Sequence, residues 1–277
     1  MLARTDDFTP ARPAFEARNL TLDYRTSNGS LRAVDDVSFT ACEGERLVLL
    51  GRSGCGKSSI LKMLAGFIAP TEGNIFVRGR PARGAGPDRI VIFQEFDQLL
   101  PWKTVRENVA FPLRVAEGVS RAEARDRAAE ALRKVGLERA IDVFPHTLSG
   151  GMKQRAAIAR ALVTNTDILL MDEPFAALDA LTRRRLQEDL LALAEEEGFT
   201  LLFVTHSIEE AILVGTKLHL LSAHPGRTIT TFDTAEFRLG NASGDRFDSV
   251  VSEVNGLLFD ERQRHQDRED SHKKEPA

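Results

Sequence analysis

The chain has 277 residues, of which 42 % are hydrophobic, enough for one large domain or two smaller ones with a substantial core. Its 37 basic and 41 acidic residues leave a formal charge of −4, so it lacks the basic excess that attracts nucleic acid or anionic lipid. Its apolar runs are shorter than the stretch of about 20 residues that a membrane-spanning helix needs. The N-terminal residues do not resemble a secretory signal, and Cys42 and Cys55 have neither disulfide nor metal spacing. These features predict a soluble cytoplasmic α/β protein.

Strand patterns dominate the first third of the chain. After a polar start over residues 1–13, which we expect to be flexible, apolar and polar side chains alternate in two segments, as in exposed strands. A continuous apolar run then ends at Gly51, as in a strand buried on both faces, and a helical period follows it. Strands are expected at residues 15–25, 31–41, 46–51, around 74–82 and at 89–94, with a helix at 58–68.

The rest of the chain changes character twice. From Val105 to about Gly136 it is rich in Ala, Arg and Glu with apolar spacing near 3.6, which predicts amphipathic helices. Buried-strand and helix patterns then resume, and this order predicts a doubly wound parallel sheet with a helical block inserted at about 97–163. The tail from about Phe259 is charged and is expected to be disordered. The later strands are expected at 167–174, 200–206 and 217–223, and the later helices at 180–198 and 207–215.

A glycine-rich segment, GRSGCGKSS, joins the first buried strand to the first helix and fits the pattern G-x-x-x-x-G-K-[ST]. Glycines let backbone N–H groups curl around phosphate oxygens, and the helix N-terminus adds positive charge. Lys57 would bind the β- and γ-phosphates, and the Ser58 hydroxyl would ligate Mg²⁺. The alternative is a glycine-rich turn with an incidental lysine. The predicted phosphate cradle comprises Gly51, Arg52, Ser53, Gly54, Cys55, Gly56, Lys57, Ser58 and Ser59.

The segment DILLMDEP delivers two carboxylates at the end of a buried strand, the edge where ligands of such sheets gather. Asp172 would hold Mg²⁺ through its waters, because this cation prefers oxygen ligands and keeps part of its hydration shell. Glu173 would polarise the water that attacks the γ-phosphate. The alternative is an ordinary surface acid at a strand end. The cradle alone leaves kinase, GTPase, helicase and ATPase open, and Glu173 favours hydrolysis.

The segment LSGGMKQ lies within the helical block, and with it the chain resembles the ATP-binding subunits of ABC transporters. Ser149 can cap a helix while Gly150 and Gly151 expose backbone N–H groups to an anion. The resemblance implies that this signature segment, with Gln154, faces the γ-phosphate of ATP bound by a second copy in a head-to-tail dimer. The alternative is a capped helix start, which leaves the double glycine unexplained.

The resemblance extends to single residues along the chain. It implies that Gln94 contacts Mg²⁺ and the attacking water, that Asp179 reaches across the dimer, and that His206 contacts the γ-phosphate. Tyr24 occupies the place of the aromatic residue that stacks on adenine. The implied fold is a P-loop NTPase (RecA-like) parallel sheet core with an N-terminal antiparallel β part and an inserted α-helical subdomain. The ATPase domain would span 14–235, followed by a C-terminal extension over 236–277.

A closer resemblance, to the nitrate, sulfonate and taurine import ATPases, rests on GPDRIVIFQEFDQLLPWKTVRENVAFPL and LSAHPGR. It implies import of a small anionic solute through a separate membrane permease, with a solute-binding protein outside and the ATPase peripheral on the inner membrane face. The apolar cluster around Trp102 suggests a docking surface for the permease, with core packing as the alternative. Two other functions stay open: an ABC ATPase of an exporter or a non-transport system, and a P-loop phosphotransferase.

Overall fold

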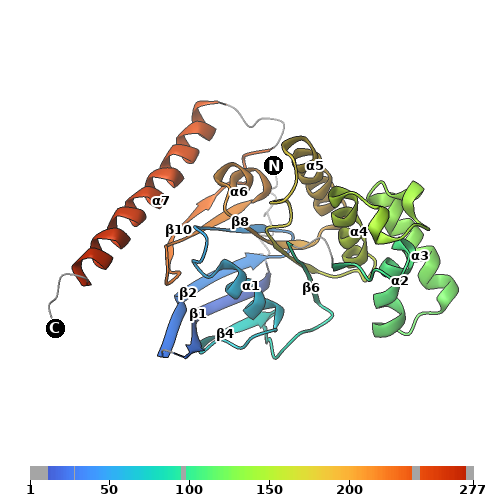
Figure 1. Ribbon diagram of the computed structural model, residues 1–277, viewed down its shortest axis with the longest axis horizontal. Coiled ribbons are helices and arrows are strands. Elements are labelled where there is room, and N and C mark those ends of the chain that lie inside the picture. Colours follow the sequence, from blue (N-terminus) through green and yellow to red (C-terminus); the bar gives the residue numbers. More distant parts are fainter. Residues whose placement is uncertain (1–11, 28, 95–97, 239–243, 273–277) are drawn as a thin grey trace, which may run out of the picture.

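The computed structural model describes residues 12–27, 29–94, 98–238 and 244–272, and side chains of the last helix as far as Phe259. Two sheets and a helical subdomain make up the main body, and one long helix stands at its side (Figure 1). Nearly all of the N-terminal segment expected to be flexible lies outside the described residues, and Pro13 already begins the first strand. Within the described ranges, no helix is both long and apolar enough to cross a membrane.

The smaller sheet is antiparallel and has the order β2-β1-β4-β5. Its two long strands form a hairpin in which Tyr24 pairs with Leu31. Alternate residues face the core, as the alternating sequence pattern predicts. This sheet is the expected N-terminal antiparallel part. Its strands are β1 (Pro13–Thr26), β2 (Gly29–Cys42), β4 (Glu72–Val77) and β5 (Arg80–Pro81).

The larger sheet has the order β10-β9-β3-β8-β7-β6, and all of its strands except β10 run parallel. The parallel core is therefore as predicted. The edge strand β10 was missing from the sequence-based expectation, because TITTFD is half-exposed and largely polar. The strands are β3 (Arg46–Leu50), β6 (Arg89–Ile92), β7 (Ile168–Asp172), β8 (Thr200–Thr205), β9 (Lys217–Leu221) and β10 (Thr228–Asp233).

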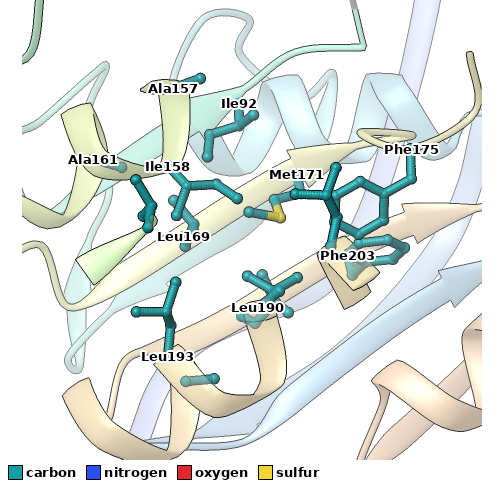
Figure 2. Close-up of a cluster of buried hydrophobic side chains, with 14 of the residues drawn as sticks. Ile92, Ala157, Ile158, Ala161, Leu169, Met171, Phe175, Leu190, Leu193 and Phe203 are labelled. Carbon is teal, nitrogen blue, oxygen red and sulfur yellow. The ribbon is translucent and has the colours of Figure 1, made fainter. Parts of the chain in front are cut away.

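The larger sheet separates two apolar cores. In β7, Leu169 and Met171 face one core, while Ile168 and Leu170 face the other. This two-sided burial explains why the parallel strands are continuous apolar runs. Figure 2 shows the first core, in which α4, through Ile158, and α5 cover β7 and β8. The second core lies between the larger sheet, α1 and the antiparallel sheet.

Polar caps begin five of the seven α-helices found among the described residues. The side chains of Thr104, Ser120, Ser149, Asp179 and Ser207 each accept a hydrogen bond from a backbone N–H of the following turn. The inserted subdomain contains α2, α3 and α4, on the far side of the molecule from the long helix (Figure 1). The helices are α1 (Lys57–Ala65), α2 (Val105–Ala116), α3 (Arg121–Lys134), α4 (Gly150–Leu162), α5 (Ala180–Glu197), α6 (Ile208–Val214) and α7 (Asp245–His272), with short 3₁₀ turns at Glu138–Ala140 and Pro145–Thr147.

The C-terminal extension differs from the expected disorder. Helix α7 continues to His272, well beyond Phe259. Its first turns are anchored, because Phe247, Val250 and Val254 are buried beside α6, and Phe247 makes an edge contact with Phe237 at 5.7 Å. The charged sequence that follows is rich in Glu, Arg and Gln, which are good helix formers, and it needs no new nucleation once the first turns exist. The high charge of this segment therefore did not distinguish an exposed helix from a disordered tail.

Candidate nucleotide-binding site

The predicted phosphate cradle lies between β3 and α1. Gly54 and Gly56 have φ of 82° and 91°, a region that only glycine enters without strain. A Cβ on Gly56 would lie 2.8 Å from the carbonyl oxygen of Ala33, so the loop also packs too closely for any side chain there. The loop curls around Lys57, whose Nζ donates to the carbonyl oxygens of Gly51 at 2.7 Å and Arg52 at 2.9 Å. The ammonium is thus fixed at the mouth of a backbone cradle.

Two oxygen ligands meet beside the cradle. The Ser58 hydroxyl, from the first turn of α1, donates to Asp172 Oδ1 at the end of β7 over 2.9 Å. Burial raises the pKa of Asp172, and the hydrogen bond from Ser58 opposes that shift. No group of three or more His, Cys, Asp and Glu side chains suited to a metal is found in the described part of the chain. A cation here would have few protein ligands and would keep water and phosphate oxygens, which fits Mg²⁺.

Glu173 and His206 meet at the ends of neighbouring parallel strands. Glu173 Oε2 lies 2.9 Å from His206 Nδ1, and because a carboxylate only accepts, Nδ1 carries the proton. Glu173 has φ of 45°, which costs a non-glycine residue of order 1 kcal/mol. Its own N–H donates to the Val204 carbonyl at 3.0 Å, so the strand pair holds this conformation. The sequence predicted both residues but not their direct contact.

A cavity of about 330 Å³ opens over the cradle. Tyr24 is 39 % exposed at its side, and its hydroxyl lies 3.0 Å from Ser59 Oγ. The cavity therefore combines an aromatic ring, the cradle and the Glu173 carboxylate. Predicted residues among its lining are Tyr24, Ser53, Gly54, Gly56, Lys57, Ser58, Ser59 and Glu173. Leu31, Ala33 and His224 also line it, and sequence reasoning had not assigned them to the site.

The loop after β9 explains why His224 lies there. Gly226 donates to the Ala33 carbonyl at 3.0 Å and accepts from the Asp35 N–H at 2.9 Å. A Cβ on Gly226 would lie 2.0 Å from the Cys55 carbonyl oxygen, so only glycine lets this loop pack on the cradle. The stretch LSAHPGR, which contributes to the resemblance to the import ATPases, contains both His224 and Gly226, but its sequence alone does not indicate that it lies on the cradle.

The signature segment forms the start of α4, with Ser149 as the expected capping residue. Ser149 is exposed and its hydroxyl accepts from the Met152 N–H at 3.3 Å. Gly150 is half-buried at the first helical position. Packing within the chain itself favours glycine at position 151, because a Cβ there would lie 2.9 Å from Thr182 Cγ2 of α5. Close packing against α5 is therefore one reason within the chain for the second glycine, beside the anion-facing role that the signature motif predicts.

Three other predicted residues lie away from the cavity. Gln154 is fully buried, and its Oε1 accepts from Gln98 Nε2 at 3.5 Å, so the structure does not bring it to a nucleotide surface. Gln94 is exposed just after β6, at the edge where β7 also ends. Asp179 caps α5 by accepting from the Thr182 N–H at 3.0 Å, and this backbone bond lowers its pKa. Among the described lining residues of the cavity, none comes from α4 or α5.

Comparison with known proteins agrees with this geometry. A family model described as ABC transporter matches residues 34–176. The chain belongs to the ABC transporter family. The taurine import ATP-binding protein TauB of Rhizobium johnstonii is 49 % identical to it over 216 residues, 78 % of this chain and 82 % of that protein. The nitrate import ATP-binding protein NrtD of Synechococcus elongatus is 39 % identical over 242 residues, 85 % of this chain and 88 % of that protein.

Solved structures of the family share the fold. The dimeric post-hydrolysis state of the ATP-binding cassette MJ0796, bound to ADP and phosphate, superposes with a TM-score of 0.69 at 32 % identity. That comparison covers 80 % of this chain and all of the other. The recognition of an ABC ATPase from the sequence motifs is therefore confirmed, together with the predicted P-loop fold. The assignments of individual site residues stay predictions.

Proposed function

We propose that the chain is the ATP-hydrolysing subunit that energises import of a small anionic solute through a separate membrane permease. The observation that carries hydrolysis is the Glu173–His206 contact, at 2.9 Å, on the same sheet edge as the Ser58–Asp172 pair. The names of the taurine and nitrate import relatives support import and an anionic solute. These relatives are 49 % and 39 % identical to this chain, over alignments that span 78 % and 85 % of it.

In this proposal the cradle binds the phosphates of ATP. Backbone N–H groups of the loop and the start of α1 face the oxygens, and Lys57 adds a full positive charge. Ser58, Asp172 and Gln94 would hold Mg²⁺, which neutralises charge on the phosphates when bound. Tyr24 would stack on the adenine, because its ring borders the cavity and its hydroxyl is tied to Ser59.

Glu173 would orient and polarise the water that attacks the γ-phosphate. Its side chain is 19 % exposed, Glu173 lines the cavity, and His206 Nδ1 donates to one of its carboxylate oxygens. A proton on each ring nitrogen would let the imidazolium hold this carboxylate and a phosphate oxygen at once. His206 would then link the position of the base to the presence of the γ-phosphate.

A second copy of the chain would complete the site. The capped start of α4, with Ser149 exposed and Gly150 half-buried, contributes nothing to the cavity of its own chain. Its N–H groups and helix dipole suit an anion, so we assign them to the γ-phosphate bound by the partner copy. Asp179, exposed at the start of α5, would take part in the same head-to-tail contact. The dimeric cassette MJ0796 supports such an assembly.

Trp102 would contact the permease. Its side chain is 70 % exposed, which argues against the alternative that it fills the core of the helical subdomain. Phe111 and Val115 of α2 are 41 % and 69 % exposed. An exposed tryptophan with further apolar residues on the same subdomain is typical of a protein contact. The ATPase would then sit on the inner face of the membrane, coupled only indirectly to an external solute-binding protein.

The test is Glu173→Gln, which keeps the size of the side chain and removes its basicity. We expect ATP affinity within about twofold of wild type and turnover lowered about 100-fold or more, because general-base catalysis is lost. Glu188→Gln, an exposed pair with Arg184 on α5, is the matched control and should leave both values unchanged. Wild-type turnover by Glu173→Gln would remove Glu173 from the mechanism.

A further inference from the structure

A buried acid lies behind the Glu173–His206 pair. Glu210, in the first turn of α6, is only 9 % exposed. Its two carboxylate oxygens have different donors: the Thr205 hydroxyl donates to Oε2, and Gln187 Nε2 donates to Oε1 at 2.8 Å. A buried carboxylate is costly unless such donors satisfy it, so this arrangement is specific.

One of these donors is adjacent to the catalytic histidine. Thr205 is the last residue of β8 and directly precedes His206. Its Oγ also accepts from the Ser207 N–H at 3.1 Å, so one hydroxyl joins the residues on both sides of His206. The same hydroxyl donates to Glu210 Oε2. The turn that carries His206 is therefore hydrogen-bonded to the Glu210 carboxylate through the Thr205 hydroxyl.

The other donor belongs to a different element. Gln187 lies on α5 and is itself buried, at 7 % exposure. The same helix begins at the Asp179 cap, and its Thr182 packs against Gly151 of α4. Glu210 thus bonds both the turn that carries His206 and the helix that packs against the signature segment.

Simple stabilisation of α6 does not account for this network. An acid in the first turn favours the helix dipole, but Glu209 is also in that turn and is exposed, without the desolvation that burial costs. Burying a charge is a poor way to gain stability, since an apolar residue of similar volume often does as well. The bonds on both carboxylate oxygens, from β8 and α5, point to positioning.

We propose that Glu210 is a positioning residue that holds His206 against Glu173 through Thr205 and couples this pair to α5. The proposal rests on the catalytic roles proposed above for Glu173 and His206. It assigns Glu210 no contact with nucleotide. Loss of the carboxylate should therefore impair turnover while leaving binding of ATP to the cradle intact.

The experiment compares Glu210→Gln and Thr205→Val with the matched control Glu209→Gln, using the purified full-length chain and ATP. Val keeps the shape of Thr205 and removes only the hydroxyl, which guards against a Glu210 variant that fails to fold. We expect each of the first two changes to lower kcat about tenfold with KM for ATP within about twofold. The control Glu209→Gln should keep the wild-type kcat and KM.

Repeating both changes in a His206→Ala background separates positioning from general damage. If Glu210 acts through His206, the further loss of kcat there should fall to about twofold or less, because coupled residues are not additive. An equal tenfold loss in both backgrounds would overturn the proposal, as would the same loss in Glu209→Gln. Wild-type turnover by His206→Ala alone would instead overturn the proposed role of His206, and the positioning role with it.

Discussion

At the scale of single residues, the phosphate cradle fixes the position of the Lys57 ammonium before any ligand binds. Only 4 % of the residue is exposed, and Nζ donates to two carbonyl oxygens of the loop. An ammonium has three donors, and the third of Lys57 faces Cys55 Sγ at 3.9 Å, a weak acceptor that a phosphate oxygen can replace without loss of the two carbonyl contacts. The motif predicted this lysine and its neighbours, because the spacing of glycines and lysine is fixed by the backbone itself.

Lys57→Ala should therefore weaken ATP binding strongly. Loss of a hydrogen bond to a charged group costs about 2–3 kcal/mol, or roughly 30- to 150-fold in Kd. Equilibrium binding of a fluorescent ATP analogue measures this. Lys134→Ala removes a lysine of α3 that is paired with Glu197 outside the cavity, and it should bind as wild type. Equal affinity of Lys57→Ala and wild type would contradict the cradle assignment.

His219 is a buried residue whose titration bears on stability. Burial lowers its pKa from 6.5 to about 4, and its ring nitrogens lie 2.9 Å from Thr231 Oγ1 and 3.1 Å from Thr228 Oγ1. The folded chain keeps the ring neutral, whereas the unfolded chain protonates it below pH 6.5. The contribution of His219 to the free energy of unfolding is thus fully present above pH 6.5 and is lost as the pH falls toward 4.

Urea unfolding at pH 7 and pH 4.5 tests this sign. The wild type should lose about 2–3 kcal/mol from His219 between these values, in addition to losses from other groups. His219→Gln keeps a donor and an acceptor but does not titrate, so its loss over the same interval should be smaller by that amount. An identical pH dependence of the two proteins would show that His219 does not contribute.

At the scale of elements, sequence patterns predicted most of the strands and helices for a physical reason. The parallel strands are apolar throughout because both faces are buried, and polar caps mark five helix starts. The strand β10 and the helical course of α7 escaped prediction, since neither has a strong apolar pattern over its whole length. Contacts between distant segments, such as Gly226 on Cys55, have no local signal at all.

Gly226→Ala tests the contact between the β9 loop and the cradle. The new Cβ would lie 2.0 Å from the Cys55 carbonyl oxygen, so the backbone of one loop must move. We expect a loss of stability of about 2 kcal/mol and weaker ATP binding, as overpacking against backbone is not relieved by a side-chain rotation. Thermal unfolding with and without ATP measures both effects.

The control is Gly256→Ala in α7. An added Cβ there meets nothing within 4 Å, and alanine favours a helix over glycine by about 0.5–1 kcal/mol. It should leave stability equal or slightly higher and ATP binding unchanged. If Gly226→Ala behaves like this control, the loop is not a necessary part of the cradle.

At the scale of the whole molecule, one chain contains only part of the proposed site. The cavity gathers the cradle, Tyr24 and Glu173, whereas Ser149 and Asp179 lie outside its lining. The sequence predicted this division through the signature motif. The close packing of Gly151 against α5 and the burial of Gln154 could not be predicted in this way. The motif specifies residue types but not which side chains face the interior.

In the proposed mechanism, two chains share each ATP site. Sedimentation velocity of Glu173→Gln with ATP tests it most directly, because slow hydrolysis preserves the ATP that would join the copies. We predict a species of twice the 30.6 kDa chain mass that disappears without ATP. Adding Ser149→Arg should return the protein to a monomer while ATP still binds the cradle. A Glu173→Gln chain that stays monomeric with ATP, or a dimer untouched by Ser149→Arg, would contradict the shared site.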